Sequence, residues 1–428
     1  MKGLHIKNIE AKNIEAKNFE VENLRAKSTK LQEHNRQQSD QQPNRRCWIQ
    51  GLAGTILGLG TNLIIAPCIA QPNIAQTNSA QPSGVQPNTQ ITYQSSNQLG
   101  IGKPQHALIL PPSTGVYAQV HQALRSGFTA AHQRDGNNWP ISIVESDDKP
   151  TDLFNTYVEL QKAGILLVVG PITRNGVNAL IDSGAPNILT LALNQPDQDR
   201  NIPRNLIVFG LAVETEAAQI AALAFDEAST REPLRRPLRA TAIAHSSPLG
   251  RRAAAAFIDK WRELGGDCPL PIETENRTAA EIKNAIAPND PDAVFLGANL
   301  DTARLIRPAL DRKWPVYGTS QLSSAGASTL NKGHDLDGIK FVDMPWMVQA
   351  DHPAVMTYPK VPARFNNEMQ RLYALGIDAF RLAMDTLSDN KRSELDGVTG
   401  RLQVNRSLNR VERSGVLLQY QNGQIVSN

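Results

Sequence analysis

Residues 165–173 read Ile165-Leu-Leu-Val-Val169-Gly170-Pro171-Ile172-Thr173. Five consecutive apolar residues predict a strand buried on both faces, because a strand with one solvated face alternates polar and apolar residues. Gly170 and Pro171 end this strand, and a helical pattern begins at about Gly176. A fully buried strand that leads directly into a helix is the building unit of a parallel sheet covered by helices.

The same unit repeats along the chain on both sides of this stretch. The first series has predicted strands at 107–110, 141–144, 165–169 and 188–191, with helices at 116–132, 153–162 and from about 176. The second series has predicted strands at 206–209, 240–244, 293–296, 316–317 and 339–342, with helices at 214–226, 251–264 and 302–310. A long helix at 362–388 and strands at 399–405 and 415–420, expected as a terminal hairpin, close the chain.

Two successive series of strands and helices predict an α/β fold with two lobes, each a mostly parallel sheet covered by helices. Lobe 1 is expected at about 105–212 with part of 344–428, and lobe 2 at about 213–343. A cleft should separate them. Open sheets of this kind bind ligands at the carboxyl ends of their strands.

Three segments precede this domain. Residues 1–46 form a low-complexity N-terminal extension in which Lys7-Asn-Ile-Glu-Ala recurs with period five; this period fits neither a helix nor a strand, and we expect disorder. Residues 47–70 are a predicted signal peptide, because an uncharged apolar run follows Arg45 and Arg46. Residues 71–104 are rich in Gln, Asn, Ser and Pro and predict a flexible tether.

Two cleavage sites compete at the end of the predicted signal peptide. Ile65-Ala66-Pro67-Cys68 is similar to a lipobox, in which Cys68 would carry the lipid, although Pro67 stands where a small residue is expected. Ordinary cleavage after Cys68-Ile69-Ala70 has small residues at both required positions. Both alternatives remain open.

Charge and motif content exclude several classes of function. Residues 1–46 hold ten basic and six acidic residues, which leaves 34 of the 44 basic and 35 of the 41 acidic residues for the body. This near-neutral body has no electrostatic footprint for nucleic acid. The arginines between Arg231 and Arg252 cluster in sequence. A solvated surface patch is the ordinary interpretation, and a surface that faces a partner is the alternative. The body has no nucleophile elbow, phosphate loop or metal-ligand spacing, so we predict no enzyme activity, no cofactor and no metal.

Loops that follow the predicted strands carry neutral hydrogen-bonding groups. If these loops converge on the cleft between the lobes, they could bind a small-molecule ligand. The same residue types are also ordinary turn formers. The ligand-cleft candidates are Ser113, Thr114, Thr173, Asn194, Gln195, Ser246, Ser247, Asn299 and Gln321.

Five motifs in the body are distinctive. They are Leu191-Ala-Leu-Asn-Gln-Pro196, Phe209-Gly-Leu-Ala-Val-Glu214-Thr-Glu-Ala-Ala, Tyr373-Ala-Leu-Gly-Ile-Asp378-Ala-Phe, Gly397-Val-Thr-Gly400-Arg-Leu402 and Asn405-Arg406-Ser-Leu408-Asn-Arg410. With these motifs, residues 105–428 are similar to type I periplasmic binding proteins, and more narrowly resemble the LppC-type lipoproteins, the penicillin-binding-protein activators of gram-negative envelopes. The C-terminal motifs are the most specific part of the resemblance.

The resemblance implies a non-catalytic periplasmic protein, tethered to the outer membrane through a lipid anchor, that activates a bifunctional penicillin-binding protein by direct contact. The alternative is a solute receptor or ligand sensor. Amino-acid receptors of this fold bind the ligand carboxylate with hydroxyl groups in the loop that Leu191, Ala192 and Leu193 occupy here. Without hydroxyls a buried carboxylate would lose its hydrogen bonds, which disfavours an amino-acid ligand.

Overall fold

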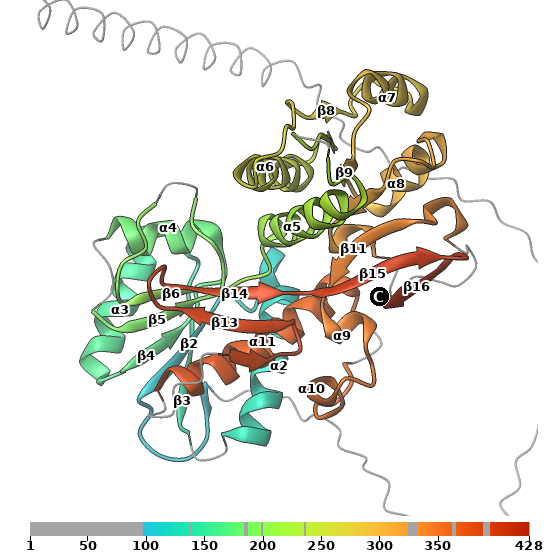
Figure 1. The fold of residues 1–428 in the computed structure, drawn as a ribbon. Helices are drawn as coiled ribbons and strands as arrows, with labels where there is room; N and C mark the ends of the chain where they lie inside the picture. The colour runs from blue at the N-terminus through green and yellow to red at the C-terminus, as the bar shows by residue number, and fades with distance from the viewer. Residues whose placement is uncertain are drawn as a thin grey trace, which may run out of the picture. The chain divides into compact units, whose positions relative to one another are not determined.

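The computed structural model describes residues 97–136, 139–183, 187–197, 200–234, 237–323, 333–361, 365–387 and 394–427. These residues form two sheets, one of nine strands and one of seven (Figure 1). We call the sheets, with the helices that cover them, lobe 1 and lobe 2. The predicted extension, the signal peptide and most of the tether lie outside the described residues, and so does Cys68. The end of the predicted tether at residue 104 is wrong, because Gln98–Leu99 form a strand, β1, that pairs with Ile141 and Ser142 in the larger sheet.

The sheet of lobe 1 has the order β1-β3-β2-β4-β5-β6-β14-β13-β12. Strands β2 to β6 are parallel, as the buried apolar runs predict. β14 continues the sheet parallel to β6, and β13 and β12 follow in antiparallel pairs. The strands are β1 (Gln98–Leu99), β2 (His106–Leu110), β3 (Ile141–Glu145), β4 (Leu167–Val169), β5 (Leu189–Ala192), β6 (Leu206–Val208), β12 (Glu394–Asp396), β13 (Arg401–Asn405) and β14 (Arg410–Ser414).

Helices cover both faces of this sheet. Alternate residues of β2 enter different cores: Ala107 and Ile109 pack with α3 and α4, whereas Leu108 and Leu110 pack with α2 and α11. Glycine allows α2 and α11 to approach closely, since a Cβ on Gly127 would lie 1.9 Å from the Tyr373 carbonyl oxygen. The helices are α2 (Ala118–Asp135), α3 (Pro150–Ala163), α4 (Arg174–Asp182) and α11 (Asn367–Leu387), with a 3₁₀ turn, η1 (Gly115–Tyr117), before α2.

The sheet of lobe 2 has the order β16-β15-β11-β10-β9-β7-β8. Every residue of β7 and β9 is buried, because one core lies on each face of the sheet. Five strands are parallel, and β15 and β16 are antiparallel additions. The strands are β7 (Ala240–Ala244), β8 (Ile272–Glu273), β9 (Ala293–Gly297), β10 (Val316–Gly318), β11 (Ile339–Asp343), β15 (Val416–Gln421) and β16 (Gln424–Ser427).

Helices also cover both faces of the second sheet. One core contains residues of α5 and α6, with Phe257 stacked on Phe295 of β9 at 4.5 Å between ring centroids. The other core contains residues of α7 and α8. The helices are α5 (Val213–Arg231), α6 (Pro248–Glu263), α7 (Ala279–Ile286) and α8 (Leu300–Ile306), with 3₁₀ turns η2 (Ala287–Asn289), η3 (Arg307–Ala309), η4 (Ser320–Leu322) and η5 (His334–Leu336).

The C-terminal strands correct one sequence prediction. We expected 399–405 and 415–420 to form a terminal hairpin, but β13 pairs with β14 in lobe 1, and β15 pairs with β11 and β16 in lobe 2. The prediction was wrong because it missed β14 and β16, which supply the true hairpin partners. Two short helices that the sequence pattern did not indicate, α9 (Pro345–Val348) and α10 (Pro353–Met356), precede α11.

Three chain segments pass between the lobes. Residues 209–212 connect β6 to α5, Met344 connects β11 to α9, and Gly415 connects β14 to β15. Figure 1 shows β14 and β15 as an almost continuous ribbon that runs from one sheet into the other. The lobes therefore meet at three short connections, and the side chains around these connections decide how firmly the lobes are joined.

Candidate functional site

The Gly415 connection is held by a side chain of α5. The Gln219 side-chain amide donates to the Gly415 carbonyl and its oxygen accepts from the Gly415 N–H, both at 2.9 Å. A Cβ at position 415 would lie 2.9 Å from the Asp343 carbonyl oxygen. Two of the three connections are thus in contact, and only glycine allows this approach.

A buried ion pair lies beside this connection. Arg413, on β14, donates to the Glu216 carboxylate of α5 at 2.7 Å, and to the Thr399 carbonyl at 3.1 Å. The second Glu216 oxygen accepts from the Ser320 N–H at 3.0 Å, at the start of η4. Glu216 therefore links the last strand of lobe 1 to a turn of lobe 2 through charge-assisted hydrogen bonds, which are stronger than neutral ones.

A second buried ion pair joins the end of β11 to α11. Arg371 donates to both oxygens of Asp343, at 2.5 and 2.9 Å. Burial disfavours the charged guanidinium, but the negative charge of Asp343 raises the pKa of Arg371 above its ordinary value. Because Asp343 also accepts from the Met344 N–H at 2.7 Å, this pair fixes the backbone at the second connection.

About two helical turns further along α11, Asp378 is completely buried. It accepts from the Val398 and Thr399 N–H groups at 3.1 and 2.7 Å and from the Thr399 hydroxyl at 2.6 Å. Burial raises the pKa of Asp378, although Arg381 and these donors act in the opposite direction. The turn at Thr399 is thus held on both sides, because it donates to Asp378 and accepts from Arg413.

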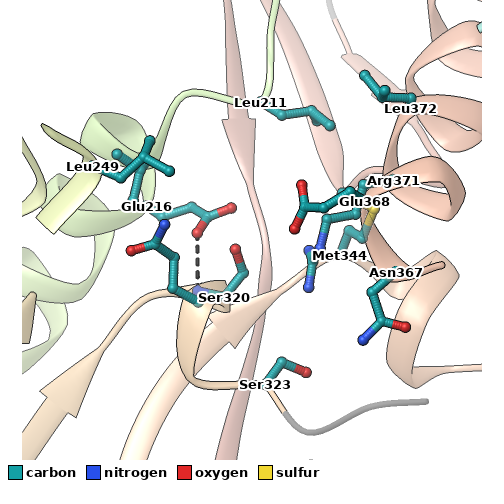
Figure 2. A pocket seen from close by; sticks show the side chains of 12 residues that line it. Leu211, Glu216, Leu249, Ser320, Ser323, Met344, Asn367, Glu368, Arg371 and Leu372 are labelled. Carbon is teal, nitrogen blue, oxygen red and sulfur yellow. Dashed lines mark hydrogen bonds between the residues drawn. The ribbon is translucent and has the colours of Figure 1, made fainter. Parts of the chain in front are cut away.

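A pocket of about 320 Å³ opens at this junction (Figure 2). Its walls come from the first connection, α5, η4, the second connection, α6 and α11. The residues that line it are Leu211, Val213, Glu216, Leu249, Ser320, Gln321, Ser323, Met344, Asn367, Glu368, Arg371 and Leu372.

The charged side chains that line this pocket differ in how readily they could contact a ligand. Glu216 and Arg371 use their charges in the two buried ion pairs, whereas Glu368 is exposed. Figure 2 shows the dashed bond from Ser320 to Glu216, with Glu368 and Arg371 on the opposite wall. None of the described lining residues is a histidine or a cysteine. The lining supplies apolar surface, hydrogen-bonding groups and one exposed carboxylate, a composition suited to holding a small polar molecule.

A more exposed ion-pair cluster lies at the start of α5. Glu214 accepts from Arg174 of α4, in lobe 1, at 3.1 Å, and its Oε1 lies 3.2 Å from Arg252 Nε of α6, in lobe 2. Arg174 also donates to the Pro196 carbonyl at 3.3 Å. This cluster bridges the lobes without being enclosed by them.

Three of the nine ligand-cleft candidates cap helices. The side chains of Thr173, Ser247 and Asn299 accept from backbone N–H groups at the first turns of α4, α6 and α8, at 3.0 to 3.1 Å. Residues of these types are preferred at that position because they satisfy N–H groups that the helix leaves unpaired. Within lobe 2 the loops of Ser247 and Asn299 are adjacent, since the His245 N–H bonds the Gly297 carbonyl.

The other six candidates lie in different environments. Asn194 donates to the Ile172 carbonyl at 2.8 Å and accepts from the Gln195 N–H, which places it beside the loop of Thr173. The Ser113 N–H bonds Glu145 at 3.1 Å, Thr114 is exposed and Ser246 is half-buried. Only Gln321 of the nine lines the junction pocket. Ligand binding by any of these residues stays a prediction.

The arginines between 231 and 252 do not form one free patch in the described part of the chain. Arg231 donates to the Asp292 carbonyl at 2.7 Å. Arg239, Arg251 and Arg252 lie within 4 Å of Asp290, Glu273 and Glu214 respectively. Arg235 and Arg236 lie outside the described residues. The described arginines thus have intramolecular partners, which weakens their interpretation as a docking surface.

Sequence reasoning missed the residues that build the junction. Glu216 and Asp378 stood inside quoted motifs, but nothing in those motifs indicated their partners. Arg413 is 197 residues from Glu216 in the chain, and no local pattern reports such a pair. A buried charge is rare unless it is paired. The available signal was therefore a charged residue within an apolar segment, as at Asp343.

Two further properties of the described residues concern the free cysteine and the helices. Cys268 is buried and free, and burial raises the pKa of its thiol to about 12, so the thiol stays protonated. No helix in the described part of the chain is both long and apolar enough to span a bilayer.

Two sheets covered on both faces, joined by three connections with a pocket at the junction, define a protein of the type I periplasmic-binding class. A solved structure with the same fold is entitled "Structure of a putative branched-chain amino acid ABC transporter from Chromobacterium violaceum ATCC 12472". It is 31% identical, with a TM-score of 0.60, and the alignment covers 74% of this chain and 99% of that one.

The particular family follows from the sequence profile described as "LppC putative lipoprotein", which matches residues 95–287 and 278–423. These matches include both lobes, and the chain belongs to the LppC family. The resemblance predicted from the motifs is therefore confirmed, and so is the two-lobed fold class.

Several proteins similar to this chain share one name. "Penicillin-binding protein activator LpoA" of Edwardsiella ictaluri is 28% identical over 380 residues, which are 78% of this chain and 52% of that protein. The structure entitled "LpoA (YraM) C-domain from Haemophilus influenzae, a regulator of PBP1A" is 21% identical, with a TM-score of 0.61, and covers 76% of this chain and 99% of that domain. The chain spans about half the length of the curated relatives that it matches.

Proposed function

We propose that this protein activates a bifunctional penicillin-binding protein, a peptidoglycan synthase, by direct contact. The observation that carries the proposal is the family match over both lobes, together with relatives that are named as activators. In this role the chain is non-catalytic. Its junction pocket offers ion-paired charges and hydrogen-bonding groups, and the two lobes present their outer surfaces to the partner.

Such an activator would act in the periplasm, on a synthase anchored in the membrane. A lipid at Cys68 would hold the chain at the outer membrane, and the residues between Cys68 and β1 would span the distance to the synthase. A tether of this length reaches roughly 30 Å as a flexible coil. The intact mass of the mature protein distinguishes lipidation at Cys68 from cleavage after Ala70.

The test is a rate measurement. Glycan polymerisation and peptide crosslinking by the host's bifunctional synthase are followed with and without the purified protein, over a range of protein concentrations. We expect a several-fold stimulation that saturates, because stimulation by contact ends when all the synthase is bound. Absence of both stimulation and binding would overturn the proposal.

A second candidate function is ligand sensing, favoured by the 31% identity to the Chromobacterium violaceum protein over nearly its whole length. Leu193 is buried in the core of lobe 1, and the loop that follows β5 offers no hydroxyl before Asn194. This disfavours a ligand whose carboxylate would bind there. A thermal-shift screen of small envelope metabolites tests ligand sensing. If a metabolite raises the melting temperature of the wild type but not of Glu368→Gln, this result would indicate binding in the junction pocket.

A further inference from the structure

A second pocket, of about 490 Å³, lies away from the junction, on the segment between β11 and α11. It shares no lining residue with the junction pocket. Its described walls come from α9, α10, the chain that follows α10 and the beginning of α11. The residues that line it are Trp346, Ala350, Val355, Met356, Tyr358, Lys360, Val361, Phe365 and Gln370.

The walls of this pocket are firmly attached to lobe 1. The Tyr358 hydroxyl donates to Asp135 at 3.0 Å, and the Arg134 guanidinium lies 5.2 Å from the centre of the Tyr358 ring. The Tyr373 hydroxyl donates to the Pro359 carbonyl at 3.2 Å, and the Trp346 N–H donates to the Val398 carbonyl at 2.9 Å. A pocket held at several points of a folded lobe is formed before anything binds, which reduces the entropy lost on binding.

Apolar and aromatic groups dominate the lining. Of its lining residues, Tyr358, Val355 and Phe365 are buried, whereas Met356 remains 68% exposed. Aromatic residues and methionine are enriched at the centres of protein interfaces, where a few anchoring side chains provide most of the binding free energy. A single large apolar side chain from a partner would cover this surface.

Charge narrows the chemistry of the occupant. Lys360 is exposed and is the one charged group among the described lining residues. No described carboxylate forms an ion pair with it. A partner group that fills the apolar pocket would therefore gain from a carboxylate close to that group.

We propose that this pocket, which we call the α10 pocket, is a docking site for one large apolar side chain with an acidic neighbour, supplied by a partner protein. The proposal rests on the proposed function for the identity of that partner. Gln370 of α11 and Phe365, two residues before the helix, line this pocket, and Asn367, Glu368, Arg371 and Leu372 of α11 line the junction pocket. Both pockets are thus built on the first turns of one helix.

The first experiment tests the chemistry without any partner. N-acetyl-tryptophan and its amide have the same apolar group, but only the former carries a carboxylate. Methionine methyl groups labelled with ¹³C report where each binds, because Met356 lines the α10 pocket and Met344 lines the junction pocket. We expect the acid to shift the Met356 resonance and to bind about twofold to fivefold more tightly than the amide, the range that an exposed ion pair provides.

Two variants and a control sharpen this measurement. Lys360→Glu should remove the preference for the acid, and Ala350→Trp, at an exposed position on the rim, should abolish binding of both probes. Lys283→Glu, an exposed charge reversal on α7 in lobe 2, should change nothing. An unchanged Met344 resonance shows that a variant is folded. If neither probe shifts Met356, or if Lys360→Glu retains the preference, the proposal is overturned.

The second experiment uses the host's bifunctional synthase. Ala350→Trp should weaken binding of the synthase at least tenfold, as blocking an anchoring side chain does, and Lys283→Glu should not weaken it. If the wild-type chain binds and Ala350→Trp binds equally well, the α10 pocket is not the docking site, while the proposed function stands. If the wild-type chain does not bind the synthase, the proposed function fails. The binding of N-acetyl-tryptophan and its amide then decides by itself whether the α10 pocket is a docking site.

Discussion

Glu214 and Glu216 stand two residues apart on α5, and both carboxylates bridge the lobes, but they do so in different surroundings. The Glu216 side chain is 5% exposed and accepts from Arg413 of lobe 1 and from the Ser320 N–H of lobe 2. The Glu214 side chain is 23% exposed and lies between Arg174 of lobe 1 and Arg252 of lobe 2. The same residue type thus forms a buried link and a solvated link at one junction.

The difference in exposure between the two ion pairs indicates which of them would break more easily if the lobes moved relative to each other. A buried ion pair is expensive to break, because each charge would remain in a medium that solvates it poorly. An exposed pair exchanges its partner for water at little cost and is screened by salt. We therefore interpret the Glu216 link as the fixed part of the junction and the Glu214 link as the adjustable part.

The largest expected effect follows from removing the charge of Glu216. Glu216→Gln leaves the Arg413 guanidinium, 2% exposed, without a counter-charge. We expect the free energy of unfolding to fall by about 3–5 kcal/mol, measured by urea denaturation. Glu214→Gln is the matched control, and replacing Glu216 and Arg413 together by leucine should recover part of the loss relative to Glu216→Leu. Equal losses for the two Gln variants would contradict the comparison.

A neutral contact at the same junction should have a smaller effect. Gln219→Ala removes both hydrogen bonds to Gly415, and these backbone groups are only partly buried. We expect a loss of about 1–2 kcal/mol in the free energy of unfolding and faster hydrogen exchange at the Gly415 amide. Gln161→Ala, at an exposed position of α3, serves as the control. Unchanged exchange at Gly415 would mean that water replaces Gln219 fully.

A buried titratable group without a counter-charge provides a third case. His132 is buried, and no carboxylate among the described residues pairs with its ring; its Nε2 lies 2.7 Å from the Trp139 carbonyl oxygen. Burial lowers the pKa of His132 below its ordinary value, against the weaker effect of that carbonyl. Below pH ~6.5 the unfolded chain then binds a proton that the folded chain does not. The free energy of unfolding should therefore fall as the pH drops through that value.

The direction of this change in the free energy of unfolding can be checked by urea denaturation at pH 7.5, 6.5 and 5.5. His132→Gln should reduce the decrease in stability between pH 7.5 and 5.5, because the proton uptake of this site is removed. His334→Gln, in an exposed turn, should leave the pH dependence as it is in the wild type. A steeper pH dependence in His132→Gln would show that the folded state stabilises the charged ring.

The alternation of buried strands and helices was predictable because its signals are local. The run at 165–169 contains β4, and the runs at 240–244 and 293–296 coincide with the central strands of lobe 2. Each of these strands is buried on both faces, so its own composition reports its place in a covered parallel sheet. The sequence also indicates Thr173, Ser247 and Asn299, but it predicts them as ligand-cleft candidates, whereas the structure shows that they cap helices.

The junction could not be predicted in the same way. Its ion pairs join residues that are far apart in the chain, and the assignment of β14 and β15 to different sheets depends on a turn at Gly415 that no local pattern marks. α9 and α10 are four residues each and too short to show a periodic pattern. The residues that determine the lobe junction were therefore the hardest to predict from the sequence.

The smallest expected effect tests the adjustable link itself. Glu214→Gln should lower the free energy of unfolding by less than about 1 kcal/mol, since both its arginine partners remain partly solvated. A double-mutant cycle of Glu214→Gln with Arg174→Met should give a coupling that weakens as salt rises from 0.05 to 1 M, whereas a Glu216–Arg413 cycle should barely respond. If both couplings respond equally to salt, solvent reaches Glu216 as readily as Glu214. The Glu216 link would then be no more fixed than the Glu214 link, and the two carboxylates would not differ in their role at the junction.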